Sequence, residues 1–82
     1  MSQKRSKDQI VAQILDLCHD GASKTKIVYQ VNLNFRTVVT YLNLLLEKGL
    51  LEAIQGDRPI FKTTKAGEKA LKTLLDAEAI YS

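Results

Sequence analysis

The sequence predicts a mainly α-helical fold with a small β-hairpin, in the order helix, helix, helix, strand, strand, helix. Three observations support this order. Apolar residues recur at helical spacing in four stretches of the chain. A Ser, Asn or Thr that can cap a helix precedes each of these stretches. Between the third and the fourth stretch, two short apolar runs flank a group of turn residues, which is typical of a hairpin.

The composition is that of one globular domain, and we treat residues 1–82 as a single unit. Of the 82 residues, 45% are hydrophobic and 26% are charged. No apolar run approaches the roughly 20 residues that span a bilayer, and no apolar segment follows the basic N-terminus as in a secretory signal. These features predict a soluble, cytoplasmic protein. Residues 1–5 are expected to form a flexible basic tail.

The first helix is predicted over residues 6–19. Ser6 and Gln9 have the spacing of a capping box, and Asp8 places a negative charge near the positive end of the helix. The apolar stripe consists of Ile10, Val11, Ile14, Leu15 and Cys18. Cys18, the single cysteine, is expected to be a small buried hydrophobe. His19 lies near the C-terminal end, where a histidine more often interacts with the helix dipole than acts in catalysis.

A second, short helix is predicted after a break in the apolar pattern at residues 20–22. Ser23 can cap this helix by accepting a hydrogen bond from an amide of its first turn. Its inner side consists of Ile27, Val28 and Val31. Asn32 tolerates the left-handed conformation that ends a helix, and a tight link of residues 32–34 leads to the next helix.

The third helix, residues 34–48, has two distinct faces. Asn34 can cap it by accepting from the amide of Thr37, and Gly49 can adopt the left-handed conformation that ends it. The apolar face consists of Phe35, Val38, Leu42, Leu45 and Leu46. The polar face consists of Arg36, Thr40, Asn43 and Glu47. Leu44 falls toward the polar face, so either the hairpin or a second subunit is expected to cover it.

The pattern after the third helix predicts a hairpin. Residues 50–54 and 59–63 read as strands, and residues 55–58 read as the turn between them. Pro59 lacks an amide proton and therefore fits the start or the edge of a strand. Because an isolated hairpin is marginally stable in water, this one is expected to pack on the helices.

Thr64 can cap a last helix over residues 65–80. Its apolar stripe consists of Ala70, Leu74, Ala77 and Tyr81, with Leu71 and Leu75 beside it. This stripe can pack against the first helix of the same chain, or it can pair with the same helix of a second copy. The heptad-like spacing modestly favours a homodimer through the C-terminal helix.

The positive charge is concentrated in the middle of the chain. The net charge is +3, from 12 Lys and Arg against 9 Asp and Glu. Two segments, residues 21–46 and 58–65, contain Lys and Arg but no acid, whereas the last ten residues contain acids but no base. Such an asymmetry is expected if one surface of the protein contacts a polyanion.

Two helices joined by a tight link form a helix-turn-helix, and the hairpin that follows makes the predicted fold a winged helix-turn-helix. The motifs YLNLLLEKGLLE (residues 41–52) and FKTTKAG (residues 61–67) resemble those of small archaeal winged-helix proteins, a group of transcriptional regulators and ten-kilodalton chromosomal proteins. The resemblance implies binding of double-stranded DNA through the third helix, wing contacts to the backbone or minor groove, and dimerisation through the terminal helix. Those relatives have a long coiled-coil helix, whereas this chain stops at Ser82, which leaves the dimer geometry open.

The residue types on the third helix fit the reading of base edges in the major groove. Arg can bond guanine, Asn can bond adenine, and Thr can contact a thymine methyl group or a phosphate. The candidates on this helix are Asn34, Arg36, Thr37, Thr40, Tyr41 and Asn43, with Arg36 and Thr40 as the central pair. For Tyr41, a phosphate contact and half-buried packing are both open. Candidate phosphate contacts elsewhere are Lys24, Lys26, Arg58 and Lys62.

Other functional classes fit the sequence less well. An enzyme is not expected, because the chain has one His, one Cys, no evident pair of catalytic acids and no phosphate-binding glycine loop. No metal, cofactor or small-molecule ligand is identified. The alternatives to a transcriptional regulator are a low-specificity, nucleoid-associated chromosomal protein and a winged helix that binds protein. The two acid-free segments favour DNA.

Overall fold

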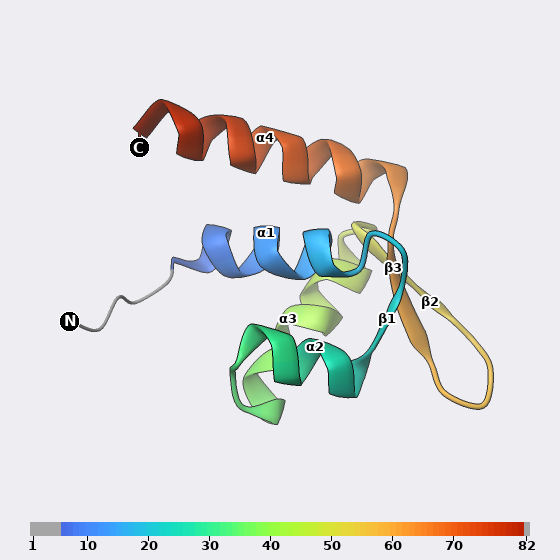
Figure 1. The fold of residues 1–82 in the computed structure, drawn as a ribbon. Helices are drawn as coiled ribbons and strands as arrows, with labels where there is room; N and C mark the ends of the chain where they lie inside the picture. Colours follow the sequence, from blue (N-terminus) through green and yellow to red (C-terminus); the bar gives the residue numbers. More distant parts are fainter. Residues whose placement is uncertain (1–5, 82) are drawn as a thin grey trace.

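A computed structural model describes the backbone of residues 6–81 and the side chains of residues 6–77. Its elements follow one another as α1 (Lys7–Leu17), β1 (Ala22–Ser23), α2 (Lys24–Val31), α3 (Phe35–Glu47), β2 (Leu51–Ile54), β3 (Ile60–Thr63) and α4 (Lys65–Tyr81) (Figure 1). This order confirms the predicted winged helix-turn-helix fold and adds one short strand, β1. The predicted basic tail, residues 1–5, lies outside the described residues.

The four helices begin where the capping residues predict. The caps are Ser6, Ser23, Asn34 and Thr64. At α1, the Ser6 hydroxyl accepts from the Gln9 amide at 3.1 Å, and the Gln9 side chain accepts from the Ser6 amide at 2.8 Å. These bonds satisfy amides that have no partner within a helix, so the helix starts are determined locally.

Left-handed residues end two of the helices, also as predicted. Asn32 follows α2 with φ 58° and ψ 47°, and Gly49 follows α3 with φ 74°. The first helix is shorter than predicted, because α1 ends at Leu17 and Cys18 is its C-terminal cap. His19 therefore belongs to the turn after α1 and not to the helix itself.

The hairpin is part of a three-stranded antiparallel sheet with the strand order β1-β3-β2. Its central strand pairs with β1 through Ala22 with Phe61 and Ser23 with Ile60. Ala22 lies in the predicted break between helices. The sequence does not predict a strand there, because two residues are too few to show an alternating pattern. The pairing matters for the site, since it joins the start of α2 to the wing, residues 51–63.

The helices and the inner face of the sheet share one hydrophobic core. The side chains with the least exposure are Ile14, Leu15, Cys18, Ile27, Val31, Val38, Leu42 and Leu45. They lie at the inner positions of α1, α2 and α3 and at the C-terminal cap of α1, and Leu51 and Phe61 close the core from the sheet. The outer surface of α3 is left free by this packing.

The last helix runs alongside α1 in the opposite direction (Figure 1). Leu71 is buried in the core and Leu74 packs against it, so α4 packs on the first helix of its own chain, one of the two arrangements that the sequence left open. Further along, Leu75 is 49% exposed and Ala77 is exposed. The apolar stripe of α4 is thus only partly used within one chain. Among the described helices, none has the length and apolar character needed to cross a bilayer.

One assignment on the apolar face of α3 needs correction. Phe35 is 58% exposed, although its angular position on the helix points toward the core. It is the first residue of α3, and side chains on a helix lean toward the N-terminus, so Phe35 lies over the capping turn, beyond the end of the core. Leu46 is half-buried and packs against the core from one side.

Candidate nucleic-acid interface

The exposed face of α3 carries three polar side chains on successive turns. We call Arg36, Thr40 and Asn43 the outer strip of α3, and all three are exposed. The opposite side of the helix is anchored by the buried Val38 and Leu42. The strip is therefore held on a rigid element and has the open surface that groove insertion requires.

Several groups near the start of α3 already have partners within the chain. The hydroxyl of Thr40 donates to the carbonyl of Arg36 at 3.1 Å, so its proton is used inside the helix. The side-chain oxygen of Asn34 accepts from the amide of Thr37 at 2.8 Å, so Asn34 serves first as a cap. Thr37 and Tyr41 are half-buried. Of these residues, Arg36 keeps the most hydrogen-bonding capacity for a ligand.

A hollow of about 590 Å³ lies between the start of α2 and the wing, and we call it the α2–wing hollow. Its lining consists of Ser23, Lys24, Thr25, Lys26, Tyr29, Arg58, Pro59 and Phe61. The pairing of β1 with β3 creates it, since that pairing places the first turn of α2 beside the strand that follows Arg58. The hollow thus brings together three of the predicted phosphate contacts, Lys24, Lys26 and Arg58.

The first turn of α2 adds backbone donors to this hollow. The hydroxyl of Ser23 accepts from the amide of Lys26 at 3.2 Å, and the first turn of α2 contains no acidic residue. The amides of Lys24 and Thr25 belong to the group that no helical carbonyl can satisfy. A helix start with free amides and adjacent lysines favours an anion such as a phosphate.

The α2–wing hollow connects to the outer strip through an aromatic contact. The ammonium nitrogen of Lys24 lies 5.4 Å from the centre of the Phe35 ring, a cation–π distance. Because Phe35 immediately precedes Arg36, the hollow adjoins the N-terminal end of the strip. The exposure of Phe35 thus has a specific consequence, which is to position a lysine between the two parts of the surface.

The cations of this surface are free of internal ion pairs. Within residues 6–77, the ion pairs join His19 to Asp20 and to Glu68, and none involves a lysine or an arginine. Lys62 differs from the others, because it is exposed on β3 directly opposite Glu52 of β2 and does not line the hollow. The structure thus brings Lys24, Lys26 and Arg58 together but leaves Lys62 beside an acid.

Tyr29 is a part of the surface that is missing from the candidates chosen on the sequence. It is 81% exposed on α2 and lines the α2–wing hollow. The buried positions of α2, Ile27 and Val31, lie one turn apart, so the position midway between them must face outward. The sequence signal for Tyr29 is its type and position, since it is a large aromatic residue on the outward face of a capped helix.

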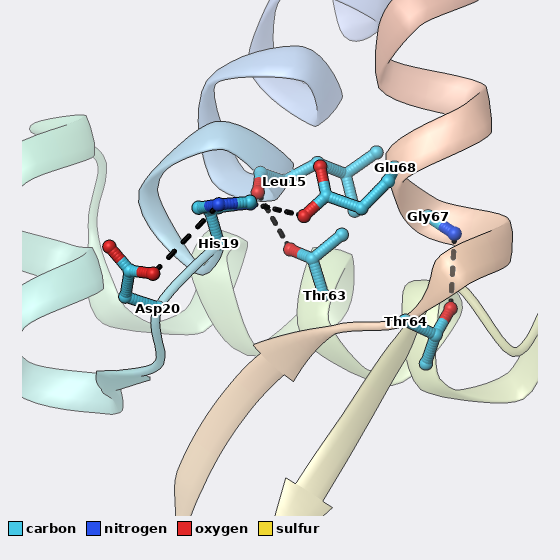
Figure 2. A network of polar contacts seen from close by, with 7 residues as sticks. All are labelled: Leu15, His19, Asp20, Thr63, Thr64, Gly67 and Glu68. Atoms are coloured by element: carbon cyan, nitrogen blue, oxygen red, sulfur yellow. Dashed lines mark hydrogen bonds and ion pairs between the residues drawn. The ribbon is translucent and has the colours of Figure 1, made fainter.

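His19 has a structural role at the junction of α1 and α4. Its Nδ1 contacts a carboxylate oxygen of Glu68, in the first turn of α4, and its Nε2 lies 3.8 Å from Asp20 (Figure 2). The hydrogen bond to Glu68 and the nearby negative charges raise the pKa of His19 above its ordinary value. Burial raises the pKa of the Cys18 thiol to about 11, so the thiol is protonated and unreactive at neutral pH.

Comparison with known proteins gives a consistent result. A family model described as winged helix-turn-helix matches residues 4–81 of the chain. An uncharacterized protein of Methanocaldococcus jannaschii, MJ0287, is 30% identical over 74 residues, which cover 89% of this chain and 73% of the relative.

The solved structures that share the fold include a DNA-binding protein and a repressor. The DNA-binding protein Sso10a-2 of Sulfolobus solfataricus superposes with a TM-score of 0.87 at 24% identity, covering 94% of this chain and 82% of that one. The multiple antibiotic-resistance repressor MarR of Listeria monocytogenes superposes with a TM-score of 0.76 at 15% identity, covering 88% of this chain and 52% of that one.

Proposed function

Because this chain belongs to the winged helix-turn-helix family, we propose that it binds double-stranded DNA and acts as a transcriptional regulator. In this proposal α3 enters the major groove, and residues 55–62 of the wing contact the backbone or the minor groove. The protein is a binding module without enzymatic activity, and it works on the nucleoid in the cytoplasm.

The observation that carries the proposal is the continuity of the surface. The α2–wing hollow, with Lys24, Lys26 and Arg58, adjoins the outer strip of α3 through the contact between Lys24 and Phe35. None of these cations is neutralised by an acid among the described side chains. A phosphate bound in the hollow would fix the register of the protein, and the strip would then face the base edges.

The roles of the individual residues follow from their remaining hydrogen-bonding capacity. Arg36 can bond guanine in a bidentate manner and Asn43 can bond adenine, whereas Thr40 keeps a methyl group and acceptor lone pairs. Tyr41 and Lys62 contribute less in this scheme, because Tyr41 is half-buried and Lys62 lies opposite Glu52. Asn34 and Thr37 chiefly hold the start of the helix in place.

Two proteins of the same fold have different described roles. Sso10a-2 is a DNA-binding protein, and MarR is a repressor. We favour a regulator over a low-specificity chromosomal protein, because the outer strip combines three different base-reading side chains. A winged helix that binds only protein would have no need for cations that converge on one hollow.

We also propose that the protein is a homodimer through α4. Leu75 and Ala77 remain exposed on this helix after it has packed on α1. Ala77 lies on nearly the opposite side of α4 from Leu75, so in this proposal the second copy covers Leu75. The dimer would then carry two α3 helices. With one DNA turn of roughly 34 Å between the two helices, the binding site would be a palindrome.

The proposal is tested by titrating the protein with a random-sequence duplex at several salt concentrations. A surface that neutralises several phosphates should give an affinity that falls linearly with salt on a double-logarithmic plot. Absence of binding at low salt would refute DNA binding. Selection of bound duplexes from a random pool then separates the two DNA-binding roles, because a regulator enriches a motif and a chromosomal protein does not.

A further inference from the structure

Leu44 is an apolar residue on the outward side of α3. Its side chain is 42% exposed, and it lies one turn after Thr40. The sequence pattern predicts that the wing or a second subunit covers it. Leu44 stays exposed in the structure, and the hollow beside it is lined by residues of α1 and α3 and by none of the wing.

The surroundings of Leu44 form a second, smaller hollow of about 190 Å³. Lys7, Thr40, Tyr41 and Leu44 line it. Since the hydroxyl proton of Thr40 is donated to the carbonyl of Arg36, Thr40 offers this hollow a methyl group and no free donor. The hollow is thus mainly apolar, and Lys7 from the first turn of α1 supplies a positive charge.

This combination matches one feature of the major groove. The C5-methyl group of thymine is the apolar group that base edges present there, and phosphates border the groove on both sides. We propose that Leu44, together with Thr40 and Tyr41, contacts the C5-methyl group of thymine while Lys7 contacts a neighbouring phosphate. This inference rests on the proposed DNA binding and adds to it a specific preference for thymine.

The neighbourhood of Leu44 favours DNA over a second copy of the chain as the occupant. The hollow shares Thr40 with the outer strip, so it is continuous with the surface proposed to enter the groove. A subunit contact centred on Leu44 would bury the charge of Lys7, and no acid among the described side chains lines the hollow to compensate it. The exposed apolar residues of α4 do not line this hollow and are therefore a separate surface.

The inference is tested with two duplexes of the same alternating A·T sequence, one with thymine and one with deoxyuridine, which differ in this methyl group. The parent protein should bind the thymine duplex about fourfold more tightly for each methyl group that it contacts. Leu44→Ala should lose most of this preference, and Thr40 and Tyr41 should account for the remainder. Leu44→Met, which keeps an apolar side chain of similar reach, should retain the preference.

The matched control is Leu75→Ala on α4, which removes the same atoms from a residue with 49% exposure. It can alter overall affinity through the dimer but should leave the ratio between the two duplexes unchanged. Circular dichroism and thermal unfolding verify that each variant is folded.

Three results would overturn the inference. The parent could bind both duplexes equally, Leu44→Ala could keep the full preference, or Leu44→Ala could lose a dimer that Leu75→Ala retains, which would assign the hollow to a subunit contact. Failure of the proposed function looks different, because the parent would then bind neither duplex at low salt.

Discussion

The hydroxyl of Thr63 in β3 donates a hydrogen bond of 2.6 Å to the carbonyl of Leu15 in α1 (Figure 2). This carbonyl lies in the last turn of the helix, where the amide of His19 donates to Asp16 instead. The amide of Thr63 also donates to the carbonyl of Cys18, at 3.0 Å. Thr63 thus donates hydrogen bonds to two carbonyl groups at the C-terminal end of α1, in a buried environment.

Replacing Thr63 by Val should destabilise the protein. The two side chains have nearly the same shape, but Val leaves the Leu15 carbonyl buried without this donor, at a cost of about 1–3 kcal/mol. Chemical denaturation measures the difference. Thr73→Val is the matched control, because the Thr73 hydroxyl bonds to the Lys69 carbonyl at an exposed site and its loss should change stability little. Equal effects of the two substitutions would contradict the role assigned to Thr63.

Gly67→Ala should be among the most damaging substitutions in the chain. A Cβ atom at Gly67 would lie 2.1 Å from the carbonyl oxygen of Leu50 and 2.6 Å from a methyl carbon of Thr63. Relief requires α4 to move away from the sheet, and we expect a loss of about 3 kcal/mol. Gly56→Ala in the wing turn is the control. Its nearest atom would be 3.9 Å away, and its effect should stay below about 0.5 kcal/mol.

Alanine substitutions on the proposed interface should separate two kinds of contact. Arg36→Ala should cost about 1–3 kcal/mol on the preferred duplex and relax the base preference, whereas Lys24→Ala should weaken all duplexes alike and reduce the salt slope by about 1. Lys62→Ala should have a smaller effect than Lys24→Ala, because Glu52 faces it. Lys72→Ala on the exposed side of α4 is the control cation, and an equal effect there would refute the assignment.

The contact between His19 and Glu68 should make stability depend on pH. Because the pKa of His19 is raised in the folded protein, its contribution is fully present below the ordinary value of 6.5 and is lost as the pH rises through the raised value. The gap in free energy of unfolding between the parent and His19→Gln should therefore be larger at about pH 5.5 than at about pH 9. Denaturation at the two pH values measures it.

The control for His19 is Glu68→Gln, which removes the first cause of the raised pKa. In that background the pH dependence of the His19→Gln effect should shrink, although Asp20 and Asp16 still act on the ring. A gap that is the same at both pH values in the parent background would show that the contact contributes nothing through ionisation.

Sedimentation tests the proposed dimer. The parent should show a mass near twice 9.2 kDa at micromolar concentration. Leu75→Glu should shift it toward the monomer, because a carboxylate would be buried between two copies of α4. Thr73→Glu introduces the same side chain at an exposed position on the opposite side of the helix and should leave the mass unchanged. A monomeric parent would remove the dimer from the proposal.

Local features of the fold were predictable because their causes are local. Ser6, Ser23 and Asn34 cap their helices through amides two or three residues away, and Asn32 and Gly49 take the left-handed conformations expected of them. The hydrophobic periodicity also placed most core residues correctly. The strand β1 was not predictable, because it exists only through its pairing with β3, far along the chain.

For the candidate site, the available side chains could be read from the sequence: the polar face of α3, two acid-free basic segments and an apolar Leu44 among polar neighbours. Their grouping on the surface could not, because it arises from the folded arrangement of the elements. The β1–β3 pairing brings Arg58 to Lys24, and the end of the core leaves Phe35 exposed beside that lysine. The physical reason is that capping and periodicity act over a few residues, whereas surface grouping depends on contacts between elements that are distant in the chain.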